Sequence, residues 1–134
     1  MFNELAQEIH ANALDKGFWQ KNKNIPEKLM LIVSELGEAC EALRNNNTFK
    51  NRVHDSKEVY GKYVDQQEIA NADDWEGFVG NFQTFIKDSY EDELADTIIR
   101  LLDLCAFEAI DIDWHIRQKM KYNSQRGKLH GKQF

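Results

Sequence analysis

The stretch of sequence that decides the fold is residues 26–44, which read PEKLMLIVSELGEACEALR. Its apolar residues recur every three or four positions, the spacing that places them along one face of an α-helix. Pro26 suits the first turn of such a helix, and the polar triplet at 45–47 ends it. We therefore expect an amphipathic helix whose apolar face is formed by Leu29, Ile32, Val33, Leu36, Ala39, Cys40 and Leu43.

Three further stretches show helical spacing. One covers about 2–16 and ends at Gly17, one runs from a capping Ser89 to about 110, and the last covers about 113–124. Between them, apolar and aromatic residues suggest two shorter helices, near 55–70 and 73–87. The sequence therefore predicts an all-α fold with four main helices and a variable helical insertion in the middle.

Length and composition favour a single domain over 1–134. The 134 residues suffice for one modest core, and one proline and seven glycines are few breaks for a chain of this length. A net charge of −6 argues against nucleic acid as a partner, and no apolar run is long enough for a membrane span. Since no signal peptide is visible, we expect a cytoplasmic protein in which Cys40 and Cys105 are reduced and buried.

The charge is unevenly distributed along the chain. The segment from Trp114 to the C-terminus holds six Lys or Arg and no Asp or Glu, whereas all 23 acidic residues precede it. Within this segment Lys119, Asn123 and Arg126 share one helical face, where they could bind phosphate and a sugar or base. The alternative is a solvated basic helix end that complements the helix dipole.

Two carboxylate pairs are the main candidates for chemistry. Glu35 and Glu38 lie three residues apart on the 26–44 helix, and Glu93 and Asp96 have the same spacing on a later helix. Residues at this spacing are neighbours on a helix, and like charges there repel. If the two helices pack together, the four carboxylates require a cation, and oxygen ligands favour Mg²⁺ or Mn²⁺. Spacing alone leaves two solvated acidic faces as the alternative.

Two other side chains near these pairs have two interpretations each. Arg100, four residues after Asp96, could pair with that carboxylate or bind phosphate. Trp19, which precedes the 26–44 helix, could stack on a nucleobase, although such an aromatic is more often part of the core. A di-iron site is excluded because neither pair has the Glu-x-x-His pattern that such sites need.

Two motifs in this order resemble those of a known family. Residues 31–43, LIVSELGEACEAL, and residues 91–100, EDELADTIIR, resemble the motifs of the all-α NTP pyrophosphohydrolase (MazG-like) superfamily. Residues 119–132 resemble the closing segment of many members, so that the resemblance covers roughly 18–44 and 88–132. It implies a four-helix-bundle-type fold that hydrolyses an NTP to NMP and pyrophosphate. Ser34 departs from the family, since many members carry a glutamate there, and the number of metal ions stays open.

The resemblance also implies roles for individual residues. Mg²⁺, with Mn²⁺ as a possible substitute, is expected to be held by Glu35, Glu38, Glu93 and Asp96. Glu38 or Glu41 is the expected proton acceptor for the attacking water. The expected nucleotide-binding residues are Trp19, Arg100, Lys119, Asn123 and Arg126. Family members usually form homodimers or dimers of dimers, and long amphipathic helices in so short a chain agree with this.

Two alternative functions remain open at the level of sequence. One is a phosphoribosyl-nucleotide pyrophosphohydrolase, which uses a similar helical site. The other is a non-catalytic acidic helical module that binds a partner protein. Metal-dependent release of pyrophosphate from nucleotides separates the enzymes from the binding module, and the preferred base and sugar stay open.

Overall fold

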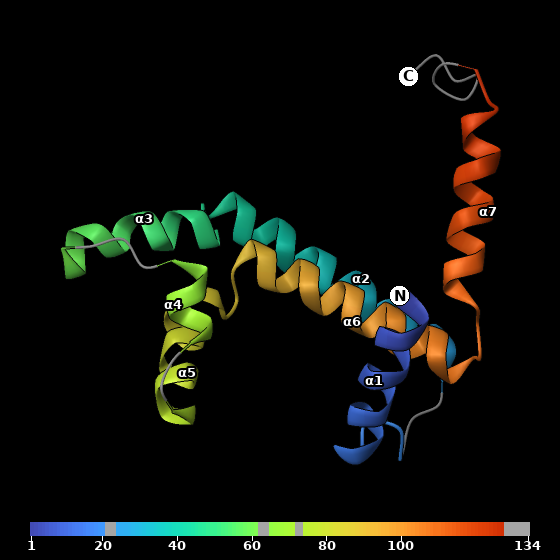
Figure 1. Ribbon diagram of the computed structural model, residues 1–134, viewed down its shortest axis with the longest axis horizontal. Coiled ribbons are helices and arrows are strands. Elements are labelled where there is room, and N and C mark those ends of the chain that lie inside the picture. The colour runs from blue at the N-terminus through green and yellow to red at the C-terminus, as the bar shows by residue number, and fades with distance from the viewer. Residues whose placement is uncertain (21–23, 62–64, 72–73, 128–134) are drawn as a thin grey trace. The chain divides into compact units, whose positions relative to one another are not determined.

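The computed structural model describes residues 1–20, 24–61, 65–71 and 74–127, and the described residues form helices and no strand (Figure 1). The prediction of an all-α fold is therefore confirmed. Parts of the connector at 20–24, of the helix expected over 55–70 and of the closing segment at 119–132 lie outside the described residues. The elements are α1 (Phe2–Asp15), α2 (Ile25–Arg44), α3 (Phe49–Tyr60), α4 (Gln66–Ala70), α5 (Trp75–Asn81), the π-helical segment η1 (Phe82–Ile86), α6 (Tyr90–Phe107) and α7 (Ile112–Ser124).

The chain divides into two compact units. The first unit comprises Met1–Ile25 and Ile99–Phe134, and the second unit comprises Pro26–Ile98. Each unit has its own buried apolar residues. Those of the first unit are Ala6, Trp19, Leu102, Leu104 and Cys105, and those of the second are Ile32, Ala39, Ala42, Ile69 and Phe85.

In the second unit, α2 ends where the polar triplet was expected to end it. Asn46 adopts a left-handed backbone conformation with a φ of 54°, which asparagine tolerates better than most residues. The Asn47 N–H donates to the Ala42 carbonyl at 2.8 Å, and the Asn46 N–H donates to the Leu43 carbonyl at 3.1 Å. These two bonds form a Schellman motif, which satisfies carbonyl groups at the end of the helix.

The start of α6 is attached to the end of α2. Ser89 is fully buried, and its hydroxyl oxygen accepts from the Asp92 N–H at 3.3 Å, as expected for a helix cap. The Tyr90 N–H donates to the Asn47 carbonyl at 2.9 Å. Arg52 of α3 donates to the Asn47 side chain at 2.7 Å and reinforces this junction. As a result, α2 and the N-terminal half of α6 lie side by side and run in opposite directions (Figure 1).

The middle of the chain differs from the prediction in its boundaries. The prediction of one helix over 55–70 is wrong. Instead, α3 already begins after Thr48, whose side chain caps it, and ends before Gly61. Gly61 has a φ of 72°, a conformation that stops a helix. The helix expected over 73–87 exists but changes at Phe82 from α5 to η1. The side chain of Asp74 caps α5 by accepting from the Gly77 N–H at 2.7 Å.

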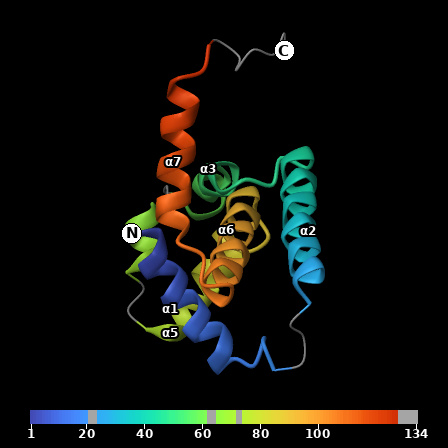
Figure 2. The same ribbon diagram turned by 90° about the vertical axis from the view of Figure 1, so that its right-hand side faces the viewer.

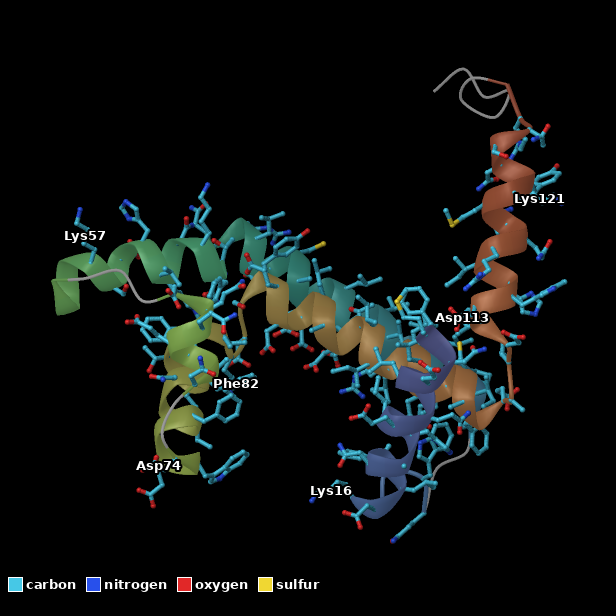
Figure 3. The ribbon with its side chains drawn as sticks, viewed as in Figure 1. Lys16, Lys57, Asp74, Phe82, Asp113 and Lys121 are labelled. Carbon is cyan, nitrogen blue, oxygen red and sulfur yellow. The ribbon has the colours of Figure 1, made fainter. Side chains whose placement is uncertain are left out.

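In the first unit, α1 packs alongside the C-terminal half of α6 (Figure 2). Gly17, with a φ of 79°, ends α1 as predicted, and the Phe18 N–H donates to the Ala13 carbonyl at 3.0 Å. The opposite end of α1 is capped from α7. The carboxylate of Asp113, labelled in Figure 3, accepts from the Phe2 N–H at 3.2 Å. These contacts position α1 between α6 and α7.

Cys105 is buried, as predicted, but the prediction of a buried Cys40 is wrong because its side chain is exposed. The buried side of α2 runs through Ile32, Ala39 and Ala42, and Cys40 lies beside this side rather than on it. No helix in the described part of the chain combines the length and the apolar character that crossing a membrane requires.

Candidate metal centre

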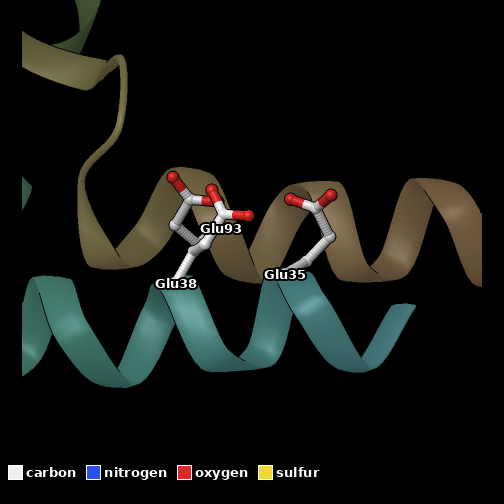
Figure 4. Close-up of side chains that lie close together, drawn as sticks. All are labelled: Glu35, Glu38 and Glu93. Carbon is white, nitrogen blue, oxygen red and sulfur yellow. The ribbon is translucent and has the colours of Figure 1, made fainter. Parts of the chain in front are cut away.

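Three carboxylates converge in the second unit. Glu35 and Glu38 extend from α2 toward α6, which contributes Glu93 (Figure 4). One carboxylate oxygen from each of the three residues lies within 4.8 Å of the chosen oxygens of the other two. Glu35 and Glu93 are each 6% exposed, whereas Glu38 is exposed. We call these three residues the carboxylate cluster, which has two buried members and one on the solvent side.

The local sequence explains why these side chains meet. A spacing of three residues places Glu35 and Glu38 on neighbouring turns of α2. Glu35 shares the buried side of α2 with Ala39 and Ala42. Because α6 runs in the opposite direction to α2, Glu93 in its first turn lies opposite the middle of α2. The cluster is therefore a product of the pairing of α2 with α6, which spacing within one helix does not determine.

Within the carboxylate cluster, Glu93 has a strongly shifted pKa. Its pKa is raised from 4.5 to about 7, first by burial and then by the charges of Glu38 and Glu35. Asp92 and Asp96 raise this pKa further. Each of these causes disfavours the ionised carboxylate, and a bound divalent cation would act in the opposite direction. The cluster therefore offers carboxylate oxygens that could hold a divalent cation.

The fourth predicted ligand, Asp96, lies outside the carboxylate cluster. It is half-buried on α6, three residues after Glu93, and its charge contributes to the raised pKa of Glu93. The structure thus brings together three of the four predicted ligands within 4.8 Å. Asp96 lies close enough to act electrostatically on the site.

The two candidate proton acceptors differ in position. Glu38 belongs to the carboxylate cluster, and the Ser34 hydroxyl donates to its carboxylate at 3.4 Å. Glu41 is exposed and accepts from Arg44 at 3.0 Å and from Asn45 at 3.1 Å. Glu41 therefore lies near the end of α2, outside the carboxylate cluster. Glu38 is the better candidate for the proton acceptor because it belongs to the cluster.

Trp19 is part of a buried network in the first unit. Only 3% of the residue is exposed, and its ring stacks on Phe107 with centroids 4.0 Å apart. The indole N–H donates to both carboxylate oxygens of Asp103, at 3.0 and 2.9 Å, and His10 Nδ1 lies 2.6 Å from the same carboxylate. Sequence reasoning missed this network. The sequence shows a histidine and an aspartate next to apolar residues in helical segments. This pattern does not identify which side chains contact each other.

The predicted phosphate-binding residues also lie in the first unit. Arg100 is exposed on α6. Near the end of α7, the Lys119 ammonium lies 5.5 Å and the Arg126 guanidinium 5.6 Å from the centre of the Tyr122 ring. Asn123 is half-buried there, and its Oδ1 has no hydrogen-bond partner among the described residues. Two of the predicted cations therefore gather around one aromatic ring.

The fold and the site together define an all-α protein with a partly buried carboxylate cluster between two antiparallel helices. No protein-family model, curated protein sequence or solved structure matches this chain. The carboxylate cluster is therefore the feature from which a function is inferred.

Proposed function

We propose that this protein is a divalent-cation-dependent hydrolase that cleaves nucleoside triphosphates to nucleoside monophosphates and pyrophosphate. The observation that carries the proposal is the carboxylate cluster, in which Glu35, Glu38 and Glu93 lie within 4.8 Å of one another. The nucleotide substrate is supported by the resemblance of residues 31–43 and 91–100 to the MazG-like motifs.

The donor set of the cluster fits Mg²⁺ or Mn²⁺. Both ions prefer carboxylate oxygens, and Mg²⁺ usually keeps several of its sites for water and substrate phosphate. Glu35 and Glu93 are buried, whereas Glu38 is exposed to solvent. Burial and then the neighbouring carboxylate charges raise the pKa of Glu93, and a bound cation would favour its ionised form.

The three glutamates have different roles in the proposed reaction. A divalent cation, when bound, neutralises phosphate charge and makes a bound water more acidic. Glu35 and Glu93 provide fixed ligands, and Glu38 accepts the proton of the attacking water. The water oxygen forms a bond to the α-phosphorus, the bond from this phosphorus to the bridging oxygen breaks, and pyrophosphate leaves with the electron pair.

The role of the basic residues stays a prediction. Arg100, Lys119, Asn123 and Arg126 each carry donors suited to a phosphate, a sugar or a base edge. A polyanionic substrate benefits from such donors because the carboxylate cluster is itself negative.

Pyrophosphate release from a panel of NTPs and dNTPs, in Mg²⁺ and in EDTA, tests the proposal. We expect release in Mg²⁺ and none in EDTA. Glu38→Gln should lower the turnover number by about 100-fold or more, the range for removal of a general base. Glu8→Gln, which removes one exposed charge from the middle of α1, is the matched control and should keep wild-type turnover.

Three outcomes decide between the proposal and its alternatives. No metal-dependent release from any nucleotide contradicts the enzymatic function. Stabilisation by Mg²⁺ without turnover points to a metal-binding module that is not an enzyme. Full turnover in Glu38→Gln, with an unchanged circular dichroism spectrum, removes Glu38 from the site.

A further inference from the structure

Asn47 joins three helices at the corner that follows α2. Its N–H donates to the Ala42 carbonyl of α2 at 2.8 Å, and its carbonyl accepts from the Tyr90 N–H of α6 at 2.9 Å. The side-chain Nδ2 donates to the Asp88 carbonyl at 2.6 Å, and Oδ1 accepts from Arg52 Nε of α3 at 2.7 Å. The amide thus uses both a donor and an acceptor, whereas an ionised aspartate would offer acceptors only.

Arg52 determines which end of the Asn47 amide faces which partner. The guanidinium is a donor only, so that it requires the amide oxygen and turns the amide nitrogen toward Asp88. Its Nη1 also donates to the Lys87 carbonyl at 2.8 Å, directly after η1. Carbonyls at the end of a helix lack partners within that helix, and a cationic donor satisfies them. Arg52 is therefore fixed at its other end as well.

The turn that leads into α6 has an unusual backbone conformation at Asp88. Its φ is 59°, in the left-handed region that few residues other than glycine adopt. The Asp88 carbonyl accepts from Asn47, and the Asp88 N–H donates to Asp92 Oδ2 at 2.9 Å. Such a conformation persists only where its surroundings hold it. Here the side chain of Asn47 provides one of the two hydrogen bonds that hold it.

The rotation of the first turn of α6 decides where Glu93 lies. Glu93 follows the fully buried Ser89 by four residues. An atom at the surface of a helix lies about 5–6 Å from the axis, so that a rotation of about 30° displaces it by roughly 3 Å. The oxygens of the carboxylate cluster lie within 4.8 Å of one another. A small change in the turn at 88–90 would therefore suffice to separate Glu93 from the two glutamates of α2.

We propose that Asn47 is a positioning residue of the carboxylate cluster. Its amide, oriented by Arg52, fixes the turn at 88–90 and so holds Glu93 opposite the glutamates of α2. All of these residues belong to the second unit. This role deepens the proposed function, on which it rests for the bound cation, but the geometry itself can be measured without a cation.

Repulsion between Glu38 and Glu93 reports their proximity in the metal-free protein. Urea unfolding in EDTA at pH 8.0 gives the shift in midpoint that Glu38→Gln causes in the wild type and in Glu93→Gln. The difference between the two shifts is the coupling of the pair. We expect Glu38→Gln to raise the midpoint more when Glu93 is present, because it then relieves a repulsion.

Asn47→Asp tests the positioning role in the same cycle. This variant has the size of asparagine and still accepts from Arg52, but it cannot donate to the Asp88 carbonyl. We expect it to abolish the difference between the two shifts. Asn51→Ala is the matched control, because it removes a hydrogen bond of 2.8 Å to the Asn46 carbonyl that joins α3 to the end of α2. It should keep the difference.

A residue that only stabilises the fold would lower the midpoints of all chains and leave the difference between the shifts unchanged. An unchanged difference in Asn47→Asp therefore overturns the proposal. The same conclusion follows if the wild type shows no difference, or if Asn51→Ala abolishes it as completely as Asn47→Asp.

Binding of Mn²⁺, followed by electron paramagnetic resonance, separates this role from the proposed function. Asn47→Asp should weaken the binding by about 10-fold, the low end of the range for residues that support metal ligands, and Asn51→Ala should bind like the wild type. Equal affinities of the wild type and Asn47→Asp overturn the proposal. If the wild type binds no Mn²⁺ while the coupling of Glu38 and Glu93 depends on Asn47, the proposed function fails and the positioning role stands.

Discussion

Removing the charge of Glu93 is expected to stabilise the metal-free protein, and to do so most at high pH. The carboxyl group has a pKa of about 7 in the folded protein against 4.5 for its ordinary value. Between these two values the folded protein binds more protons than the unfolded chain. The free energy of unfolding therefore falls as the pH rises from about 4.5 to about 7, and the full cost is present above pH 7.

The size of this effect follows from the two pKa values. Their difference of about 2.5 corresponds to a cost of about 3 kcal/mol for the ionised carboxylate of Glu93. About 1 kcal/mol of this cost is present at pH 5.5, and about 2 kcal/mol more develops by pH 8.0. Glu93→Gln keeps the size of the side chain and removes the ionisation. Its free energy of unfolding should exceed that of the wild type by up to about 3 kcal/mol at pH 8.0 and by about 1 kcal/mol at pH 5.5.

Urea unfolding followed by circular dichroism, in EDTA at both pH values, measures the effect. Glu8→Gln, on the exposed side of α1, is the control, and its stability should follow that of the wild type at both pH values. On addition of Mg²⁺ at pH 8.0 the wild type should gain stability, because the cation binds the folded state, and Glu93→Gln should gain less. If Glu93→Gln and the wild type lose the same free energy between pH 5.5 and pH 8.0, the proposed electrostatics of the cluster are refuted.

Two further predictions concern stability in the first unit. Asp103→Asn weakens the hydrogen bonds to His10 and Trp19 and should lower the free energy of unfolding in urea by about 1–3 kcal/mol, with a red shift of tryptophan emission. An unfolding midpoint in urea equal to that of the wild type would contradict the network. Ala109 ends α6 with a φ of 54°, a conformation that costs alanine about 1–2 kcal/mol. Ala109→Gly should therefore raise the thermal midpoint by a few degrees, and a lowered midpoint would show that no strain is relieved.

The helices could be predicted from the sequence because the signals that define them are local. The 26–44 helix was expected within one residue of α2, since Pro26 and the asparagine triplet mark its ends. Ser89 likewise caps α6 at the expected position. The prediction failed over 55–70 because it followed the apolar spacing. It overlooked two local signals that mark the ends of α3, the cap at Thr48 and the left-handed Gly61.

The candidate site could be predicted only in part. Spacing indicates that Glu35 and Glu38 share one side of α2, but it does not show how far each lies from α6. The raised pKa of Glu93 depends on its burial, which is a property of the helix pair. The indole of Trp19 donates to Asp103, which is 84 residues away in the sequence. Such tertiary contacts leave no signal in local periodicity.

The error over Cys40 has its cause in the packing of α2. The sequence shows one wide apolar face on this helix, and Cys40 was expected to be buried with the rest of that face. In the second unit, the buried side of α2 is centred on Ile32, Glu35 and Ala39 instead, so that Cys40 stays exposed.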